Sequence, residues 1–303
     1  MTLTKIALLV SSLALMGCQM STGQLGTHVR PSSVDSTIEK KRSEWDKDVP
    51  KNAWSYNMVD TDARSGDRSQ RLELRNGDCT TRSKYKETYW GCENDRERVE
   101  MTNTYWNTGE DKWIGLSVKI DDEWEVSEKE HCTTIFQIHQ YEENVDQDNR
   151  PQIKTANYSS GHYLGNHGVV YGRICGNKVG ISISHMGFKD NKFEGWYKPE
   201  STFFGTVDST KGSWHDLAIR WDTSDYKNGN STFEFYVDGK RILTKKNITN
   251  EFFPEYYSFK YGLYRSYAKK DGVTTGTQVL YFDENRHGNS LESVSPNNKE
   301  AID

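Results

Sequence analysis

The sequence has little of what would place it within a membrane or on a nucleic acid. Hydrophobic residues make up 34% of its 303 residues and the mean hydropathy is -0.88, which excludes a protein with many membrane spans. The 39 lysines and arginines are outnumbered by 44 acidic residues, so no basic footprint marks a nucleic-acid binder. Glycine and proline show no collagen period, and 9 Trp, 17 Tyr and 11 Phe are too many for a wholly disordered chain. The composition predicts a folded, soluble body.

Residues 1–18 have the pattern of an export signal. Lys5 precedes a mainly apolar run, residues 6–16, that is too short to span a bilayer of about 30 Å. Leu15-Met16-Gly17-Cys18 resembles a bacterial lipobox, in which Cys18 is acylated and becomes the mature N-terminus. Gln19 then favours the outer membrane, on its periplasmic or cell-surface face. The alternative is an ordinary signal peptide cleaved nearby, which would release a secreted protein.

The remaining cysteines predict disulfides. Of the 5 cysteines in the chain, Cys79, Cys92, Cys132 and Cys175 are left after Cys18 is set aside, an even number in an oxidising compartment. Three connectivities are open. The short loop between Cys79 and Cys92 favours that pair, which leaves Cys132 with Cys175. A zinc site is the alternative, but none of these cysteines has the close spacing that zinc sites usually show.

The chain divides into a tether, one domain and a tail. Residues 19–44 are polar and free of aromatic residues until the domain begins, residues 45–286 show no repeat or internal linker, and residues 287–303 are again polar. Within the domain, short segments alternate with the period of a β-strand. They are residues 71–75, 113–118, 135–140, 179–184, 217–221 and 233–237. Asp238-Gly239 marks a hairpin turn. The pattern predicts an all-β sandwich of two antiparallel sheets with a concave groove.

One strand combines an amide with an imidazole. In Phe136-Gln137-Ile138-His139, alternation sends Gln137 and His139 to one face and the two apolar residues to the other. Such a pair by itself is more often a solvated outer face than a functional site.

Two further strands carry charged or phenolic groups in alternation. Lys260, Gly262 and Tyr264 share a face, and the glycine would let a sugar ring approach the strand closely. Its alternative is a bulge or edge glycine. In residues 96–100, Arg96, Arg98 and Glu100 share a face, as they also would in a solvated ladder of ion pairs. The functional interpretation of this strand is a guanidinium that Glu100 holds toward a carboxylate.

Together these motifs resemble the jelly-roll polysaccharide lyases, nearest to the heparin lyase I and glucuronan lyase group, with motif similarity to jelly-roll alginate lyases. The matching motifs are Arg98-Val99-Glu100, Gln137-Ile138-His139 and the segment from Ser258 to Tyr264. The resemblance spans about residues 72–285. It departs at Ser258, where alginate lyases tend to carry tyrosine, and at Arg265. These departures bear on the polymer more than on the reaction.

The resemblance implies cleavage of a uronate polymer by β-elimination and assigns a role to each motif residue. Arg98 and Gln137 would neutralise the substrate carboxylate, and His139 and Tyr264 would act as base and acid, in an order that depends on the sugar's configuration. Further residues are expected to bind substrate: Lys260, Glu100, Arg96, Arg265, and His162 and His167 of a glycine-rich loop.

Partners and alternatives follow from the same resemblance. We expect an acidic polysaccharide as substrate, a monomer, no required cofactor and no metal site, with structural calcium possible in such a fold. The alternative of another class is a glycan-binding lipoprotein with the same sandwich and no catalysis. A hydrolase would need two carboxylates flanking the scissile bond, commonly as Glu-x-Asp-x-x-Glu or Glu-x-Asp-x-Glu on one strand, and the chain carries no such run.

Overall fold

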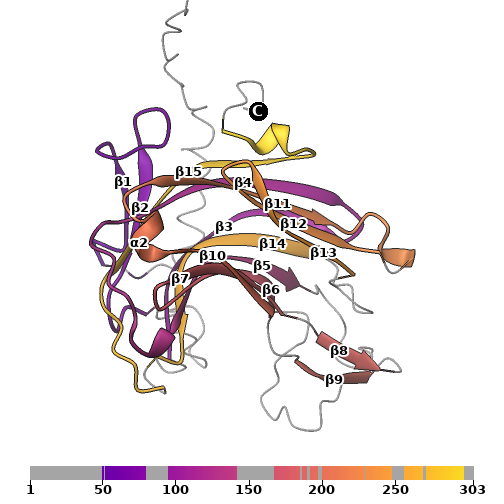
Figure 1. Cartoon of the computed structure of the whole chain (residues 1–303), viewed down its shortest axis with the longest axis horizontal. Coiled ribbons are helices and arrows are strands. Elements are labelled where there is room, and N and C mark those ends of the chain that lie inside the picture. The colour runs from indigo at the N-terminus through magenta and orange to yellow at the C-terminus, as the bar shows by residue number, and fades with distance from the viewer. Residues whose placement is uncertain are drawn as a thin grey trace, which may run out of the picture.

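The computed structural model shows two curved antiparallel sheets stacked on one another (Figure 1). It describes residues 50, 52–79, 95–141, 167–184, 186–189, 192–196, 200–228, 230–247, 256–268 and 271–296. The predicted all-β sandwich is confirmed. Across these described ranges, no helix is both long enough and apolar enough to cross a bilayer.

The seven-stranded sheet has the order β1-β2-β15-β4-β11-β12-β13. Its strands are β1 (Tyr56–Val59), β2 (Ser69–Leu74), β4 (Asp111–Ile120), β11 (Trp214–Asp222), β12 (Thr232–Val237), β13 (Lys240–Lys246) and β15 (Gln278–Gly288). The turn between β12 and β13 has positive φ at both Asp238 (51°) and Gly239 (76°). This is the turn that the sequence predicted, because aspartate and glycine tolerate that conformation.

The six-stranded sheet has the order β10-β7-β6-β5-β14-β3. Its strands are β3 (Arg96–Asn107), β5 (Cys132–Tyr141), β6 (His167–Cys175), β7 (Lys178–Ile183), β10 (Glu200–Thr206) and β14 (Tyr256–Ser266). A separate pair consists of β8 (Met186–Lys189) and β9 (Lys192–Trp196), and the short helices are α2 (Val207–Thr210), η2 (Glu128–Glu130), η3 (Tyr226–Asn228) and η4 (Glu292–Val294). The concave side of this sheet faces away from the seven-stranded sheet (Figure 1).

The core lies between the sheets and consists of the alternate, inward-pointing residues. Phe136 of β5 packs against Phe259 of β14 and Phe235 of β12, with ring centroids 5.7 and 6.0 Å apart. Burying one such ring stabilises the fold by about 1.5–3 kcal/mol. The same alternation that buries Phe136 and Phe259 sends Gln137 and Lys260 to the concave face.

A disulfide joins the ends of β5 and β6. Cys132 and Cys175 are a directly opposed pair in the sheet and are bonded to each other, as the sequence predicted. Cys79 is also disulfide-bonded. Its expected partner, Cys92, lies outside the described residues, as do Cys18, the export signal and the tether.

Strand β15 and a short helix continue past residue 286, the expected end of the domain. Strand β15 continues to Gly288, and η4 then packs Val294, which is 1% exposed, onto the seven-stranded sheet. Gly115 of β4 is required there, because a Cβ at this position would lie 2.3 Å from the Val294 carbonyl oxygen.

Candidate active site

The three predicted motifs lie on adjacent strands of the six-stranded sheet. In β14 and β3, Tyr264 is opposite Arg98 and Gly262 is opposite Glu100. In β14 and β5, Lys260 is opposite Gln137. Directly opposed residues in an antiparallel pair point to the same face. The structure therefore brings these side chains to one surface, the concave face of the sheet.

Four of the motif side chains form a continuous chain of contacts. The Gln137 amide donates from Nε2 to Glu100 Oε1 at 2.5 Å, and Glu100 Oε2 lies 3.6 Å from Arg98 Nη1. The Arg98 guanidinium lies over the Tyr264 ring, 4.6 Å from its centroid. Glu100 is only 3% exposed. The buried carboxylate thus fixes the amide and the guanidinium in relation to each other.

The Tyr264 phenol is held in its protonated form. Burial raises its pKa above the usual 10.0, and the nearby Glu100 carboxylate acts in the same direction. The Arg98 and Arg96 guanidinium groups oppose this effect without overcoming it. A protonated phenol beside two cations is suited to donate a proton to a leaving oxygen, because the cations stabilise the phenolate that results.

His139 and Lys260 share the concave face with this cluster. His139 is opposite Ser258 of β14, two pairs along from Gln137 and Lys260 and therefore on the same face. Its Nδ1 lies 3.1 Å from the Gln140 carbonyl oxygen, so a proton on Nδ1 leaves Nε2 as a base. His139 lies farther along the strand from Tyr264 than Gln137 does, and the concave curvature of the sheet inclines such side chains toward one another.

Gly262 is required by the neighbouring strand. Its φ is +139°, and a Cβ would lie 2.1 Å from the Val99 carbonyl oxygen. The sequence suggested that this glycine leaves room for a sugar ring. The structure shows that the β3 backbone already occupies the position of the missing side chain.

Irregular pairing interrupts the sheet beside the motif residues. The register of β14 against β5 shifts between Tyr261 and Tyr264, and that of β5 against β6 shifts between Thr134 and Phe136. Bulges of this kind redirect side chains and are common next to active sites. Here they determine which residues of β5 and β6 stand beside Tyr264.

Arg265 differs from its expected role and does not point to the concave face. It points to the inner side of the sheet with 0% exposure, and its Nε lies 2.8 Å from Glu97 Oε2. Alternation places it opposite in direction to Tyr264, and the buried Glu97 offsets its charge. The expectation that Arg265 binds substrate is therefore corrected: it is a structural residue of the core.

The other predicted binding residues have different outcomes. Arg96 lies beside Arg98 on the same face, and its Nη2 donates to the Tyr267 hydroxyl at 2.5 Å. His162 lies outside the described residues. The backbone of His167 begins β6, and its side chain is outside the description.

Sequence reasoning missed two residues of this surface, Tyr171 and Arg173 of β6. Tyr171 is opposite Gln137, and Arg173 is opposite Thr134. The alternation in Val170-Tyr171-Gly172-Arg173 is the same signal that was used for Gln137 and His139. Burial raises the pKa of Tyr171 to about 12, so this phenol is also protonated at neutral pH.

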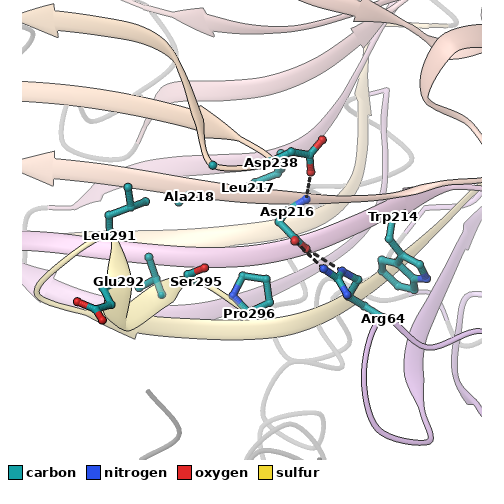
Figure 2. A pocket seen from close by; sticks show the side chains of 12 residues that line it. Arg64, Trp214, Asp216, Leu217, Ala218, Asp238, Leu291, Glu292, Ser295 and Pro296 are labelled. Atoms are coloured by element: carbon teal, nitrogen blue, oxygen red, sulfur yellow. Dashed lines mark hydrogen bonds and ion pairs between the residues drawn. The ribbon is translucent and has the colours of Figure 1, made fainter. Parts of the chain in front are cut away.

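A hollow of about 850 Å³ lies on the outer face of the seven-stranded sheet (Figure 2). Asp216 accepts from Arg64 Nε and Nη2 at 3.0 and 2.8 Å, and Asp238 accepts from the Asp216 backbone N–H at 2.8 Å. The Trp214 indole donates to Asp62 at 3.2 Å. These groups are engaged with one another and lie on the sheet opposite the motif residues.

Among the described residues, no group of three or more His, Cys, Asp or Glu side chains could hold a metal ion. The concave face brings arginine, amide, imidazole and phenol side chains together on adjacent strands.

Residues 31–286 match the family model described as polysaccharide lyase, and the chain belongs to the polysaccharide lyase family. No curated protein sequence matches the chain.

A solved lyase structure shares the jelly-roll fold of this chain, and two further lyase structures are similar to it. An endo-β-1,4-glucuronan lyase from the fungus Trichoderma reesei has a TM-score of 0.56 at 16% identity, covering 83% of this chain and 97% of that one. A variant of the family 7 alginate lyase A1-II′ in complex with substrate has a TM-score of 0.48 at 11% identity, covering 78% and 82%. An alginate lyase from Pseudomonas aeruginosa has a TM-score of 0.41 at 14% identity, covering 73% and 83%.

Proposed function

We propose that this polysaccharide lyase cleaves a uronate-containing polymer, alginate, glucuronan or a similar chain, by β-elimination on the concave face of the six-stranded sheet. The observation that carries the proposal is the contact chain from Gln137 through Glu100 and Arg98 to Tyr264. It combines two donors suited to a carboxylate with a proton donor. The glucuronan and alginate substrates named for structures of the same fold support this class of polymer.

The carboxylate donors lower the barrier to removing the proton at C5. Loss of that proton places negative charge on the adjacent carboxylate, and Arg98 and the second amide hydrogen of Gln137 stabilise this charge as it develops. Because Glu100 holds both groups in advance, they need no reorganisation during the reaction. Removing one such donor is expected to lower the rate about 100- to 1,000-fold.

The electron pair left at C5 forms the C4–C5 double bond, and the C4–O4 bond breaks. Tyr264 donates its proton to O4, which leaves as a hydroxyl at the new reducing end. Where the C5 hydrogen and O4 lie on opposite faces of the ring, His139 takes the C5 proton. Where they lie on the same face, Tyr264 acts as the base only after it has lost its own proton to solvent, and the resulting phenolate takes the C5 proton and passes it on to O4. Either route consumes no water and leaves an unsaturated uronate.

The test is the ultraviolet absorbance of unsaturated uronate, followed with the purified chain lacking its first 18 residues. Alginate, glucuronan, ulvan and heparin are offered in turn. We expect a rise with a uronate polymer, reduced about 100- to 10,000-fold in Tyr264→Phe and unchanged in Arg241→Gln, whose exposed side chain lies on β13 of the other sheet. Binding of a polymer without any rise would replace the proposal by the non-catalytic glycan-binding function.

For substrates whose C5 hydrogen and O4 lie on opposite faces, the raised pKa of Tyr264 predicts the alkaline limit of activity. Since the acid must be protonated, kcat/KM is expected to stay high until the pH exceeds about 10, the ordinary tyrosine value. An alkaline limb well below that pH would show that another group is the acid. Loss of activity in His139→Ala on only one sugar configuration would identify the substrates for which His139 is the base.

We also propose that Cys18 anchors the protein to the outer membrane, on the basis of the lipobox-like sequence before it. Metabolic labelling with a fatty acid should mark the wild-type chain and spare Cys18→Ala. Recovery of the unlabelled wild-type chain from the medium would instead indicate ordinary secretion.

A further inference from the structure

A second arginine stands in line with the catalytic tyrosine. Arg98 of β3 is opposite Tyr264 of β14, Tyr264 is opposite Thr134 of β5, and Thr134 is opposite Arg173 of β6. The four residues form one row across the four strands of the concave face. Along this row, Tyr264 has Arg98 on one side and, beyond Thr134, Arg173 on the other.

The Arg173 side chain is held by Tyr171. The Tyr171 hydroxyl donates to the Gly168 carbonyl oxygen at 2.6 Å, and a Cβ at Gly168 would lie only 2.6 Å from the Tyr171 ring. The glycine thus makes the space in which the ring lies. The Arg173 guanidinium lies over this fixed ring, 4.3 Å from its centroid. Stacking leaves the edge of the guanidinium, with its N–H groups, available to a planar oxyanion.

Arg173 has no carboxylate partner among the residues that the structure describes. In the same sheet, Arg98 is paired with Glu100 and Arg265 with Glu97, whereas the Nε of Arg173 is buried without a hydrogen-bond partner. Burial also lowers the pKa of Arg173, with the Tyr171 and Tyr264 phenols acting against it. A half-buried cation without a partner is costly, and a ligand that brings a negative charge would offset that cost.

We propose that Arg173 binds the carboxylate of a second uronate, on the opposite side of Tyr264 from the carboxylate that Arg98 binds. This inference rests on the proposed function and extends it to the substrate class: the groove selects chains in which uronates follow one another, rather than chains in which each uronate is flanked by neutral sugars. The two arginines start three strand spacings apart, about 14 Å. While Arg98 stays with Glu100 and Arg173 with Tyr171, they serve two carboxylates rather than one.

The first test separates binding from chemistry. On the uronate polymer that the wild type cleaves, Arg173→Gln is expected to raise KM about 10- to 100-fold, the usual effect of losing a hydrogen bond to a charged group, while kcat changes by less than about threefold. Arg173→Lys should recover only part of the loss, because an ammonium cannot form the paired contacts of a guanidinium. Arg241→Gln is the matched control.

Two results would overturn the inference while leaving the proposed function intact. One is a wild-type KM in Arg173→Gln. The other is a fall in kcat with KM unchanged, which would mean that Arg173 acts on Tyr264 rather than on a carboxylate. A melting temperature within about 2 °C of the wild type would show that a raised KM does not reflect a damaged fold. Absence of cleavage by the wild type on every polymer would refute the proposed function itself and this inference with it.

The second test asks whether two carboxylates are read. Random methyl esterification of the polymer removes charges without shortening the chain. For the wild type, kcat/KM should fall with roughly the square of the free-carboxylate fraction, because two sites must both be filled. For Arg173→Gln the fall should be close to linear. The same dependence in both proteins would overturn the proposal.

Discussion

Replacing Glu97 by glutamine is expected to destabilise the sandwich strongly and to leave substrate binding unchanged. The partner of Glu97 is Arg265, whose side chain has 0% exposure and whose Nε lies 2.8 Å from Glu97 Oε2. Arg265 Nη1 and Nη2 donate to the carbonyl oxygens of Gly276 and Arg75, both at 2.9 Å. Those two contacts satisfy N–H groups but supply no full negative charge. Glu97→Gln therefore leaves a buried cation without its counterion.

The cost of such a change is about 3–5 kcal/mol in the free energy of unfolding. In a domain of this size each kcal/mol corresponds to about 2–4 °C, so the melting temperature should fall by about 6–20 °C. Urea unfolding followed by circular dichroism measures the free energy directly. Glu123→Gln, at an exposed position outside the strands, is the matched control and should change it by less than about 0.5 kcal/mol.

A double variant sharpens the test. Glu97→Leu combined with Arg265→Met removes both charges and keeps the volume, so it should recover most of the stability that Glu97→Gln loses. KM should stay at the wild-type value in every variant that folds. A change below about 1 kcal/mol in Glu97→Gln, or a raised KM in a stable Arg265 variant, would refute the placement of Arg265 in the core.

Three other predictions concern stability and binding. Replacing Cys132 and Cys175 by serine opens a loop with a sequence separation of 43 and should cost about 4 kcal/mol in urea unfolding. Burial lowers the pKa of His131 from 6.5, although Asp271 Oδ2 lies 3.8 Å from its Nδ1. As the pH falls, the unfolded chain therefore binds a proton at His131 before the folded chain does. Stability should therefore fall as the pH drops below about 6.5, and less in His131→Gln. Tyr105, 53% exposed on the groove face, should stack on a sugar, so Tyr105→Ala should weaken oligouronate binding roughly fivefold, measured by calorimetry.

The sandwich and most of the groove face could be predicted because their signals are local. Period-two alternation predicts that Gln137 and His139 share one face and that Phe136 and Ile138 are buried on the other. The Asp238-Gly239 turn is predicted because these two residues tolerate positive φ. These patterns need no knowledge of which strands are neighbours. Strand β15 and η4 continue past residue 286, where polar residues obscure the apolar side chains Leu291 and Val294 that pack on the sheet.

The inward direction of Arg265 follows from a local rule, the alternation of side chains along a strand. Alternation from Tyr264 already points Arg265 inward, as it does Leu263. A buried arginine is rare unless it is paired, and Arg265 meets that condition through Glu97. Its partner Glu97 also points inward by alternation from Arg98. Arg265 and Glu97 face each other because β14 pairs with β3. The two segments are far apart along the chain, so the sequence does not reveal this pairing.

The position of Arg173 depends on register as well as on neighbourhood. Alternation within β6 gives Arg173 and Tyr171 a common face but does not say which face. A slip of one residue in the pairing of β5 with β6 would turn both side chains into the core. The shifts between Thr134 and Phe136 and between Ile138 and His139 decide the outcome, and Gly172 permits it, since a Cβ there would lie 2.2 Å from the Phe136 ring. A separate shift of β14 against β5, between Tyr261 and Tyr264, places Tyr264 beside the same Thr134. The proposed second carboxylate site and Tyr264 are therefore aligned by two pairing irregularities that meet at one part of β5.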